Sequence, residues 1–238
     1  GALLGALAAS PNTVYRPHDP KPGDVIISCW AKSGTTMMQQ MFHQLRSGGD
    51  MGFDDISRVV PWDDMAQLID FDMQTPQPYA PRGFKSHRDY DRLPSGLRYV
   101  VTLRDPRETY ASFYRFWMGW LIEPGTVSME EFMPLWMHGG PGGCDYATHL
   151  LSWYARRAEP DTLLASYSWA VKNRAAMIRR LADFCDIPLN DELAAIVDRN
   201  TSREVMVVHK DKFDDVMVCD ALAEKAGLPK GDSANVHA

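Results

Sequence analysis

A lysine, a serine, a glycine and two threonines stand together where an apolar run gives way to a helical pattern. Lys32, Ser33, Gly34, Thr35 and Thr36 bring one ammonium group and several hydroxyls to a short turn. A strand, a tight turn and a helix in this order present free backbone N–H groups at the start of the helix, where phosphate binds. The alternative is an ordinary polar turn between a buried strand and a helix. We predict a phosphate site here.

The order of these residues differs from the phosphate loop of nucleotide triphosphatases. That motif reads G-x-x-x-x-G-K-[ST], with the lysine after the last glycine. Here Lys32 precedes Gly34, and no glycine lies four residues further back. A loop this short encloses fewer phosphates, so we expect a monophosphate-like group rather than a triphosphate. A Mg²⁺-dependent nucleotide kinase or triphosphatase stays open as an alternative.

The loop also resembles a known family. The stretch from Ala31 to Thr36 is similar to the 5′-phosphosulfate loop of cytosolic-type sulfotransferases, and the chain resembles a bacterial-like member. These enzymes transfer a sulfuryl group from 3′-phosphoadenosine 5′-phosphosulfate (PAPS) to a hydroxyl or amine. The resemblance implies PAPS as cofactor and no metal. It also implies that the loop and Met37 contact the nucleotide, with Met37 standing where the family has a tryptophan that stacks on adenine.

A second similarity concerns Lys85-Ser86-His87, which resembles the Lys-Thr-His of the family. By this match His87 is the general base that takes the proton from the acceptor hydroxyl, a task that suits a neutral imidazole. Lys32 and Lys85 are then the cations that stabilise negative charge on the leaving phosphate. A core or surface histidine and a solvated lysine are the alternatives.

Further similarities concern the rest of the nucleotide. Arg104 and Ser112 hold the spacing with which the family binds the 3′-phosphate of the cofactor. An arginine can bind phosphate through two hydrogen bonds, and a serine hydroxyl adds one more. Weaker matches concern the adenine and the segment that closes over the nucleotide, and they involve Tyr167, Thr201, Ser202 and Met206.

Apolar runs that alternate with helical patterns must position these residues. We expect strands in the run that begins at 24, in 82–87, in 98–103 and in 162–167. This alternation predicts an α/β fold, a central parallel sheet flanked by helices, and the resemblance implies its P-loop-like, three-layer form. Ligands of such sheets bind beyond the carboxyl ends of the strands. Lys32, His87, Arg104 and Tyr167 should therefore meet at one edge.

Helical patterns fill much of the remaining chain. We expect helices over 37–45, from Pro106 onward, over 145–157, 169–184, 191–198 and 202–208, with one or two short helices over 54–70 that Pro61 interrupts. The Pro-rich residues 1–23 read as an extended arm, and the stretch 123–143, punctuated by Gly and Pro, as loops. A polar tail is expected after 208.

The acceptor is less well defined. The region after Arg104 is rich in aromatic and methionine side chains, namely Phe113, Phe116, Trp117, Met118, Trp120, Phe132, Met133, Trp136 and Met137. Core packing is the usual role of such residues. Apolar loops beside a cofactor site nevertheless suggest a lipophilic acceptor pocket, which a phenol, a sterol-like alcohol or a glycolipid hydroxyl would suit.

Length and charge limit the classes of protein to which the chain can belong. The 238 residues, 45% of them hydrophobic, predict one sulfotransferase domain over 1–238. A net charge of -6 argues against nucleic-acid binding. Four scattered cysteines without metal-ligand spacing predict reduced thiols and a cytoplasmic protein, and no apolar run reaches transmembrane length. We expect a small-molecule or lipid acceptor as partner and leave a homodimer open.

One departure concerns the end of the sequence. The family continues into a basic Arg-Lys-Gly stretch that clamps the 3′-phosphate, whereas this chain offers Lys230-Gly231-Asp232 and ends at Ala238. We expect that the sequence stops just before this clamp. A nucleotide-binding regulator that kept the loop but lost turnover is the non-enzymatic alternative.

Overall fold

The computed structural model describes residues 19–67, 69–120, 122–139 and 143–226. Its centre is a sheet of four parallel strands in the order β2-β1-β3-β4. The strands are β1 (Val25–Ser28), β2 (Gly83–Ser86), β3 (Arg98–Leu103) and β4 (Thr162–Ser166). Each lies inside a run predicted from sequence, and parallel pairing confirms the α/β fold with a central parallel sheet. Most of the predicted arm and the Lys230 segment lie outside the described residues.

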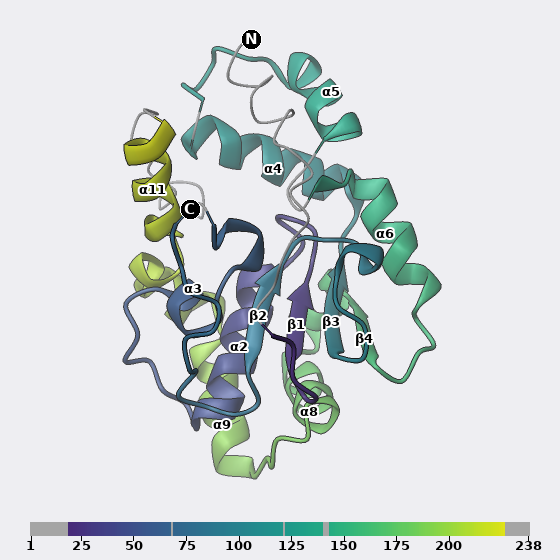
Figure 1. Ribbon diagram of the computed structural model, residues 1–238, viewed down its shortest axis with the longest axis vertical. Helices are drawn as coiled ribbons and strands as arrows, with labels where there is room; N and C mark the ends of the chain where they lie inside the picture. The colour runs from purple at the N-terminus through teal and green to yellow at the C-terminus, as the bar shows by residue number, and fades with distance from the viewer. Residues whose placement is uncertain (1–18, 68, 121, 140–142, 227–238) are drawn as a thin grey trace.

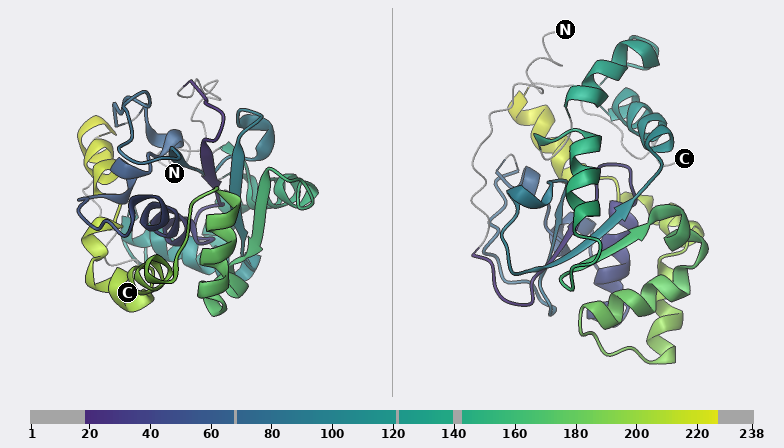
Figure 2. Two further views of the ribbon diagram at one scale, coloured as in Figure 1. Left: turned by 90° about the horizontal axis from the view of Figure 1, so that it is seen from below. Right: turned by 90° about the vertical axis from the view of Figure 1, so that its right-hand side faces the viewer.

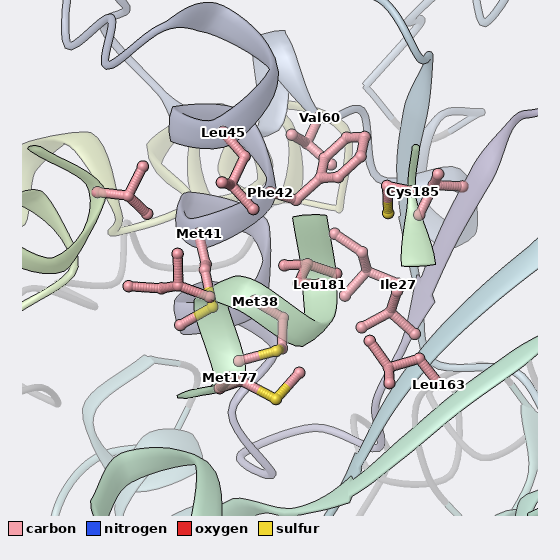
Figure 3. Packing of buried hydrophobic residues seen from close by; sticks show 14 of the residues in the cluster. Ile27, Met38, Met41, Phe42, Leu45, Val60, Leu163, Met177, Leu181 and Cys185 are labelled. Atoms are coloured by element: carbon pink, nitrogen blue, oxygen red, sulfur yellow. The ribbon is translucent and has the colours of Figure 1, made fainter. Parts of the chain in front are cut away.

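One face of the sheet is covered by three helices, α2 (Thr35–Ser47), α8 (Arg174–Phe184) and α9 (Asp191–Asn200). Ile27 and Leu163 of the sheet pack against Met38 and Phe42 of α2 and Leu181 of α8, and Figure 3 shows this packing. Full burial of side chains of this size contributes about 1.5–3 kcal/mol each. This layer therefore anchors α2, whose first turn follows the Lys32 loop.

The opposite face carries the third layer. Ile26 and Tyr99 point to this side and pack with Trp153 of α6 (Tyr146–Ala155). Residues of β1 therefore alternate, with Val25 and Ile27 in one cluster and Ile26 in the other, as the pleat of a strand requires. Figure 2 shows helices on both sides of the sheet, which confirms the three-layer arrangement.

Three helices lie above the carboxyl ends of the strands in Figure 1: α4 (Pro106–Trp120), α5 (Met129–His138) and α11 (Val216–Ala226). The remaining segments are short: α3 (Ile56–Val59), η1 (Asp63–Met65), η2 (Tyr90–Arg92), α7 (Tyr167–Lys172), α10 (Arg203–Val208) and η4 (Lys210–Lys212). None of the described helices is long and apolar enough to cross a bilayer.

The sequence predictions failed in three places. The stretch 123–143 contains α5, which begins at a capping box formed by Ser128 and Glu131, although Gly and Pro suggested loops. The chain after 208 forms η4 and α11 rather than a polar tail, because α11 buries Val218 and Cys219. The long helix over 169–184 is two helices, α7 and α8, separated at Asn173, whose backbone leaves the helical region.

Candidate active site

The loop between β1 and α2 ends in a set of hydrogen-bond donors without partners. Gly34 is the residue before α2, no side chain caps the helix, and its first turn holds no acidic residue. The first N–H groups of a helix lack partners within it. The buried hydroxyls of Ser33 and Thr35 also make no hydrogen bond with any described residue. Buried polar groups are rarely left unpaired, so this cluster of donors indicates a site for an anion.

The backbone of Gly34 lies so close to a neighbouring side chain that only a glycine fits at this position. Its φ is 103°, and a Cβ atom there would lie 2.6 Å from Cδ2 of Tyr167. Tyr167 follows β4, and the guanidinium of Arg104 lies 4.7 Å from the centre of its ring. Arg104 Nη1 in turn donates to the carbonyl oxygen of Lys32 at 2.9 Å. The ends of β3 and β4 thus support the loop after β1, as the sequence predicted.

Lys32 adopts a left-handed backbone conformation, with φ 64°, and its Nζ lies 4.5 Å from the centre of the Phe116 ring. Burial lowers the pKa of Lys32 to about 8, although the negative charge of Asp215 opposes this change. The positive charges that lower the pKa further belong to Lys85, Arg104 and Arg115. The ammonium therefore stays mainly protonated at neutral pH, but it loses its proton more readily than an ordinary lysine.

Lys85 extends from β2 into the same region. Its Nζ lies 3.1 Å from Oδ1 of Asp215 and 3.5 Å from the centre of the Trp62 ring. Burial raises the pKa of Asp215, but Lys85 and Lys32 outweigh it and hold the pKa of that carboxyl below its usual range. The Asp215 carboxylate therefore remains charged at neutral pH.

His87 follows β2 directly and is 4% exposed. Its Nδ1 lies 2.5 Å from the carbonyl oxygen of Cys29, and because a carbonyl can only accept, Nδ1 carries the proton. Nε2 is then the ring nitrogen with a lone pair. Burial, together with the charge of Lys85, lowers the pKa of His87 to about 4, so the ring is neutral at neutral pH. A neutral ring in this tautomer can accept a proton.

The other predicted nucleotide residues are less clearly brought together. Ser112 is half-buried on α4, and its hydroxyl makes no hydrogen bond with a described residue. Thr201 bonds the carbonyl oxygen of Val197 at 2.7 Å, while the Ser202 hydroxyl caps α10. Met37 and Met206 both pack against the cluster that covers the α2 face of the sheet. Beyond that common packing, no hydrogen bond or ion pair within the described part of the chain links these residues to Lys32.

Four of the nine predicted acceptor residues form a core instead of lining a cavity. Phe113, Met118, Phe132 and Trp136 are buried in one aromatic cluster around Trp30. Met133 and Met137 lie exposed on α5, and the side chain of Trp120 lies outside the described part of the structure. Phe116 and Trp117 remain. They belong to a small cluster with Trp62, Val218 and Cys219, next to the two lysines.

Three residues of this site, Asp64, Trp62 and Asp215, were missed in the sequence, whereas Phe116 stood in the predicted acceptor region. Asp64 accepts from the backbone N–H of His87 at 2.7 Å, Trp62 and Phe116 lie against the lysines, and Asp215 pairs with Lys85. None of them belongs to a local motif, and no pattern in the sequence pointed to Asp64 or Asp215. Among the described residues, no group of three His, Cys, Asp or Glu is placed to hold a metal ion.

Comparison with known proteins identifies the family to which the chain is similar. The family described as "Sulfotransferase domain" matches residues 22–218. The chain is 26% identical over 198 residues to sulfotransferase 1B1 of Canis lupus familiaris, which covers 78% of this chain and 67% of that protein. It thus spans about two thirds of the length of this relative.

Two solved structures show the same fold. The mouse sulfotransferase SULT7A1 complexed with PAP aligns with a TM-score of 0.63 at 22% identity, over 86% of this chain and 70% of that one. Retinol dehydratase in complex with androsterone and the inactive cofactor PAP aligns with a TM-score of 0.67 at 18% identity, over 95% of this chain and 74% of that one. These identities are low, so the two structures support the fold.

Proposed function

The chain belongs to the sulfotransferase domain family, and on this premise we propose that it transfers a sulfuryl group from PAPS to a hydroxyl of a lipophilic acceptor. The observation that carries the proposal is the donor set at the start of α2. Its first-turn N–H groups and the buried hydroxyls of Ser33 and Thr35 have no partner among the described residues. A 5′-phosphosulfate supplies the oxygens that such donors require.

These residues fit the cofactor. The turn is narrow, because Gly34 lies against Tyr167, and its polar groups suit a single anionic group better than a chain of three phosphates. We assign the loop from Lys32 to Met37 to the 5′ side of the nucleotide. Arg104 and Ser112 are assigned to the 3′-phosphate, with Tyr167 near the adenine. Thr201, Ser202 and Met206 stay assigned to the segment over the nucleotide by the family resemblance.

The roles of the ionisable groups follow from their charge states. PAPS supplies a sulfuryl group bound through oxygen to a phosphate, which leaves as adenosine 3′,5′-bisphosphate (PAP). His87, neutral and protonated at Nδ1, accepts the proton of the acceptor hydroxyl at Nε2. Lys32 and Lys85 provide positive charge where negative charge develops on the leaving oxygen. This stabilisation is large because both lysines lie in a poorly hydrated site.

The acceptor is proposed to lie beside Phe116, Trp117 and Trp62, where apolar rings approach the two lysines. The buried Nε1 of Trp117 has no hydrogen-bond partner among the described residues, so it can donate to an acceptor oxygen. Retinol dehydratase is known in complexes with retinol and with androsterone, which are lipophilic alcohols. This supports an apolar alcohol or phenol as acceptor class.

Thermal unfolding with added ligand tests the cofactor class. A ligand that binds the native state raises its stability by mass action. We expect adenosine 3′,5′-bisphosphate to raise the melting temperature without Mg²⁺, and ATP with Mg²⁺ to raise it less. If ATP with Mg²⁺ raised the melting temperature and the bisphosphate did not, the proposal would be overturned in favour of a kinase or triphosphatase.

Transfer of labelled sulfate from PAPS to a panel of phenols and alcohols tests the reaction. We expect His87→Ala to lower the turnover rate by about 10²–10⁴-fold, the usual contribution of a general base. Lys32→Met should lower it as well. The matched controls are His138→Ala and Lys172→Met, which change exposed residues of the same types and should leave turnover unchanged. Unchanged turnover in both site variants contradicts the proposed roles, and binding of PAP without transfer indicates a regulator.

A further inference from the structure

A carboxylate distant in sequence pairs with one lysine of the proposed site and exerts its negative charge on the other. Asp215 comes just before α11 and adopts a left-handed backbone conformation, with φ 53°. Its backbone carbonyl accepts the N–H groups of Val218 and Cys219 at 2.9 Å and 3.1 Å, so Asp215 starts the helix. Its side chain accepts from Lys85 at 3.1 Å and from the Ser57 hydroxyl at 3.3 Å, both at Oδ1.

The helix that Asp215 starts also touches the rings against which the lysines lie. Val218 and Cys219 are buried and pack in one cluster with Trp62 and Phe116. Trp62 lies against Lys85 Nζ, and Phe116 against Lys32 Nζ. Figure 1 shows α11 beside α4 at the carboxyl edge of the sheet. The segment 215–219 therefore pairs with Lys85 through the carboxylate of Asp215 and packs against the aromatic rings that lie beside both lysines.

We propose that Asp215 is a positioning residue for sulfuryl transfer, which orients the ammonium group of Lys85 and supplies the negative charge that balances the lysines of the site until the anionic donor binds. This inference rests on the proposed function. Two buried ammonium groups in one site repel each other, and a carboxylate paired with one of them offsets this repulsion. When the donor binds, its own negative charge takes over this role.

The charges around Lys32 support this assignment. The groups that face it are Asp215 before α11, Lys85 of β2, Arg104 after β3 and Arg115 of α4, and Asp215 alone carries negative charge. Asp215 also exerts the largest influence of these four charges on the pKa of Lys32. Without it, burial and three positive charges all favour the loss of the Lys32 proton.

The influence of Asp215 on the protonation of Lys32 can be measured through the pH dependence of adenosine 3′,5′-bisphosphate binding, by calorimetry from pH 6 to pH 10. The affinity of the wild-type protein should fall as Lys32 loses its proton, with a midpoint near its pKa of about 8. In Asp215→Asn the midpoint should move down by about 1–2 pH units, the usual effect of one facing charge. At the acid end this variant should bind at least as tightly as the wild type, because a negative charge near the ligand is gone.

The matched control is Asp211→Asn, which removes the same charge from an exposed position of the same segment. Its midpoint should equal that of the wild type. The conservative variant Asp215→Glu keeps the charge and should return the midpoint toward the wild-type value. At the acid end of the pH range, where Lys32 keeps its proton in both proteins, turnover should fall in Asp215→Asn through kcat rather than through KM for PAPS, because Lys85 loses its orientation. A merely structural role would lower the melting temperature and leave the midpoint in place.

Loss of Asp215 leaves Lys85 buried without a partner, which can prevent folding. The double variant Asp215→Asn, Lys85→Gln replaces the ion pair by two neutral amides and avoids this. Its midpoint should still move down, though by less, because Asp215 influences Lys32 more than Lys85 does. An unchanged or raised midpoint in both variants overturns the inference alone. A wild-type protein that binds no bisphosphate overturns the proposed function and this inference with it.

Discussion

The contact between Gly34 and Tyr167 allows a quantitative test of what fixes the conformation of the loop proposed to bind phosphate. In Gly34→Ala a methyl group would lie 2.6 Å from Cδ2 and 3.0 Å from Cε2 of the Tyr167 ring. Two costs then arise. The left-handed backbone, with φ 103°, costs an alanine about 1–2 kcal/mol. Displacement of a packed ring typically costs about 1–3 kcal/mol more.

A double-mutant cycle separates the two costs. Gly34→Ala should lower the free energy of unfolding by about 2–5 kcal/mol in the wild-type background. In a Tyr167→Ala background the ring is absent, so the same change should cost about 1–2 kcal/mol. The coupling energy between the two positions is therefore expected to be about 1–3 kcal/mol. Urea denaturation of the four proteins measures it.

Gly48 supplies a matched control at the other end of α2. Its φ is 70°, but a Cβ atom there would meet nothing within 4 Å. Gly48→Ala should therefore show only the backbone cost of about 1–2 kcal/mol. Equal costs of Gly34→Ala with and without the Tyr167 ring would refute the reasoning, because the ring would then not restrict the loop. We also expect Gly34→Ala to weaken bisphosphate binding, since displacement of Tyr167 disturbs the loop.

Three further predictions concern the same site and the thiols. The value of kcat/KM for PAPS should fall below about pH 4, where His87 gains a proton, and above about pH 8, where Lys32 loses one. An acid midpoint near the ordinary pKa of histidine would contradict a buried ring that stays neutral. Thr35→Val should leave the urea midpoint nearly unchanged, because the hydroxyl has no partner among the described residues, yet weaken bisphosphate binding by about 10–100-fold in calorimetry. The four cysteines are buried, and burial raises the pKa of Cys29 to about 11, so a disulfide exchange reagent at pH 8 should label the thiols only after unfolding; rapid labelling of the native protein would show that the core opens.

Part of the site could be predicted because its residues belong to local patterns. Lys32, His87, Arg104 and Tyr167 each follow a strand, and parallel strands bring their carboxyl ends to one edge of the sheet. The strands themselves were evident because residues buried on both faces form continuous apolar runs. The identity of each residue and its position after a strand were therefore sufficient to place it.

Other parts of the site depend on contacts between distant segments. Asp215 lies 130 positions from Lys85, and the turn before α11 brings the two together. The tautomer of His87 is set by the carbonyl oxygen of Cys29, which lies 58 positions away. The helices α5 and α11 escaped prediction because Gly, Pro and polar residues around them suggested loops. Their helical form depends on capping and on burial against other elements.

The sequence by itself determined the four strands, most of the helices and the loop proposed to bind phosphate, because periodic burial and turn chemistry are local properties of the chain. The tertiary structure decided the charge state of the site. Burial at the sheet edge lowers the pKa of Lys32 and of His87, and the negative charge of Asp215 opposes this change at Lys32. These effects depend on distances in three dimensions, and no spacing along the chain encodes them.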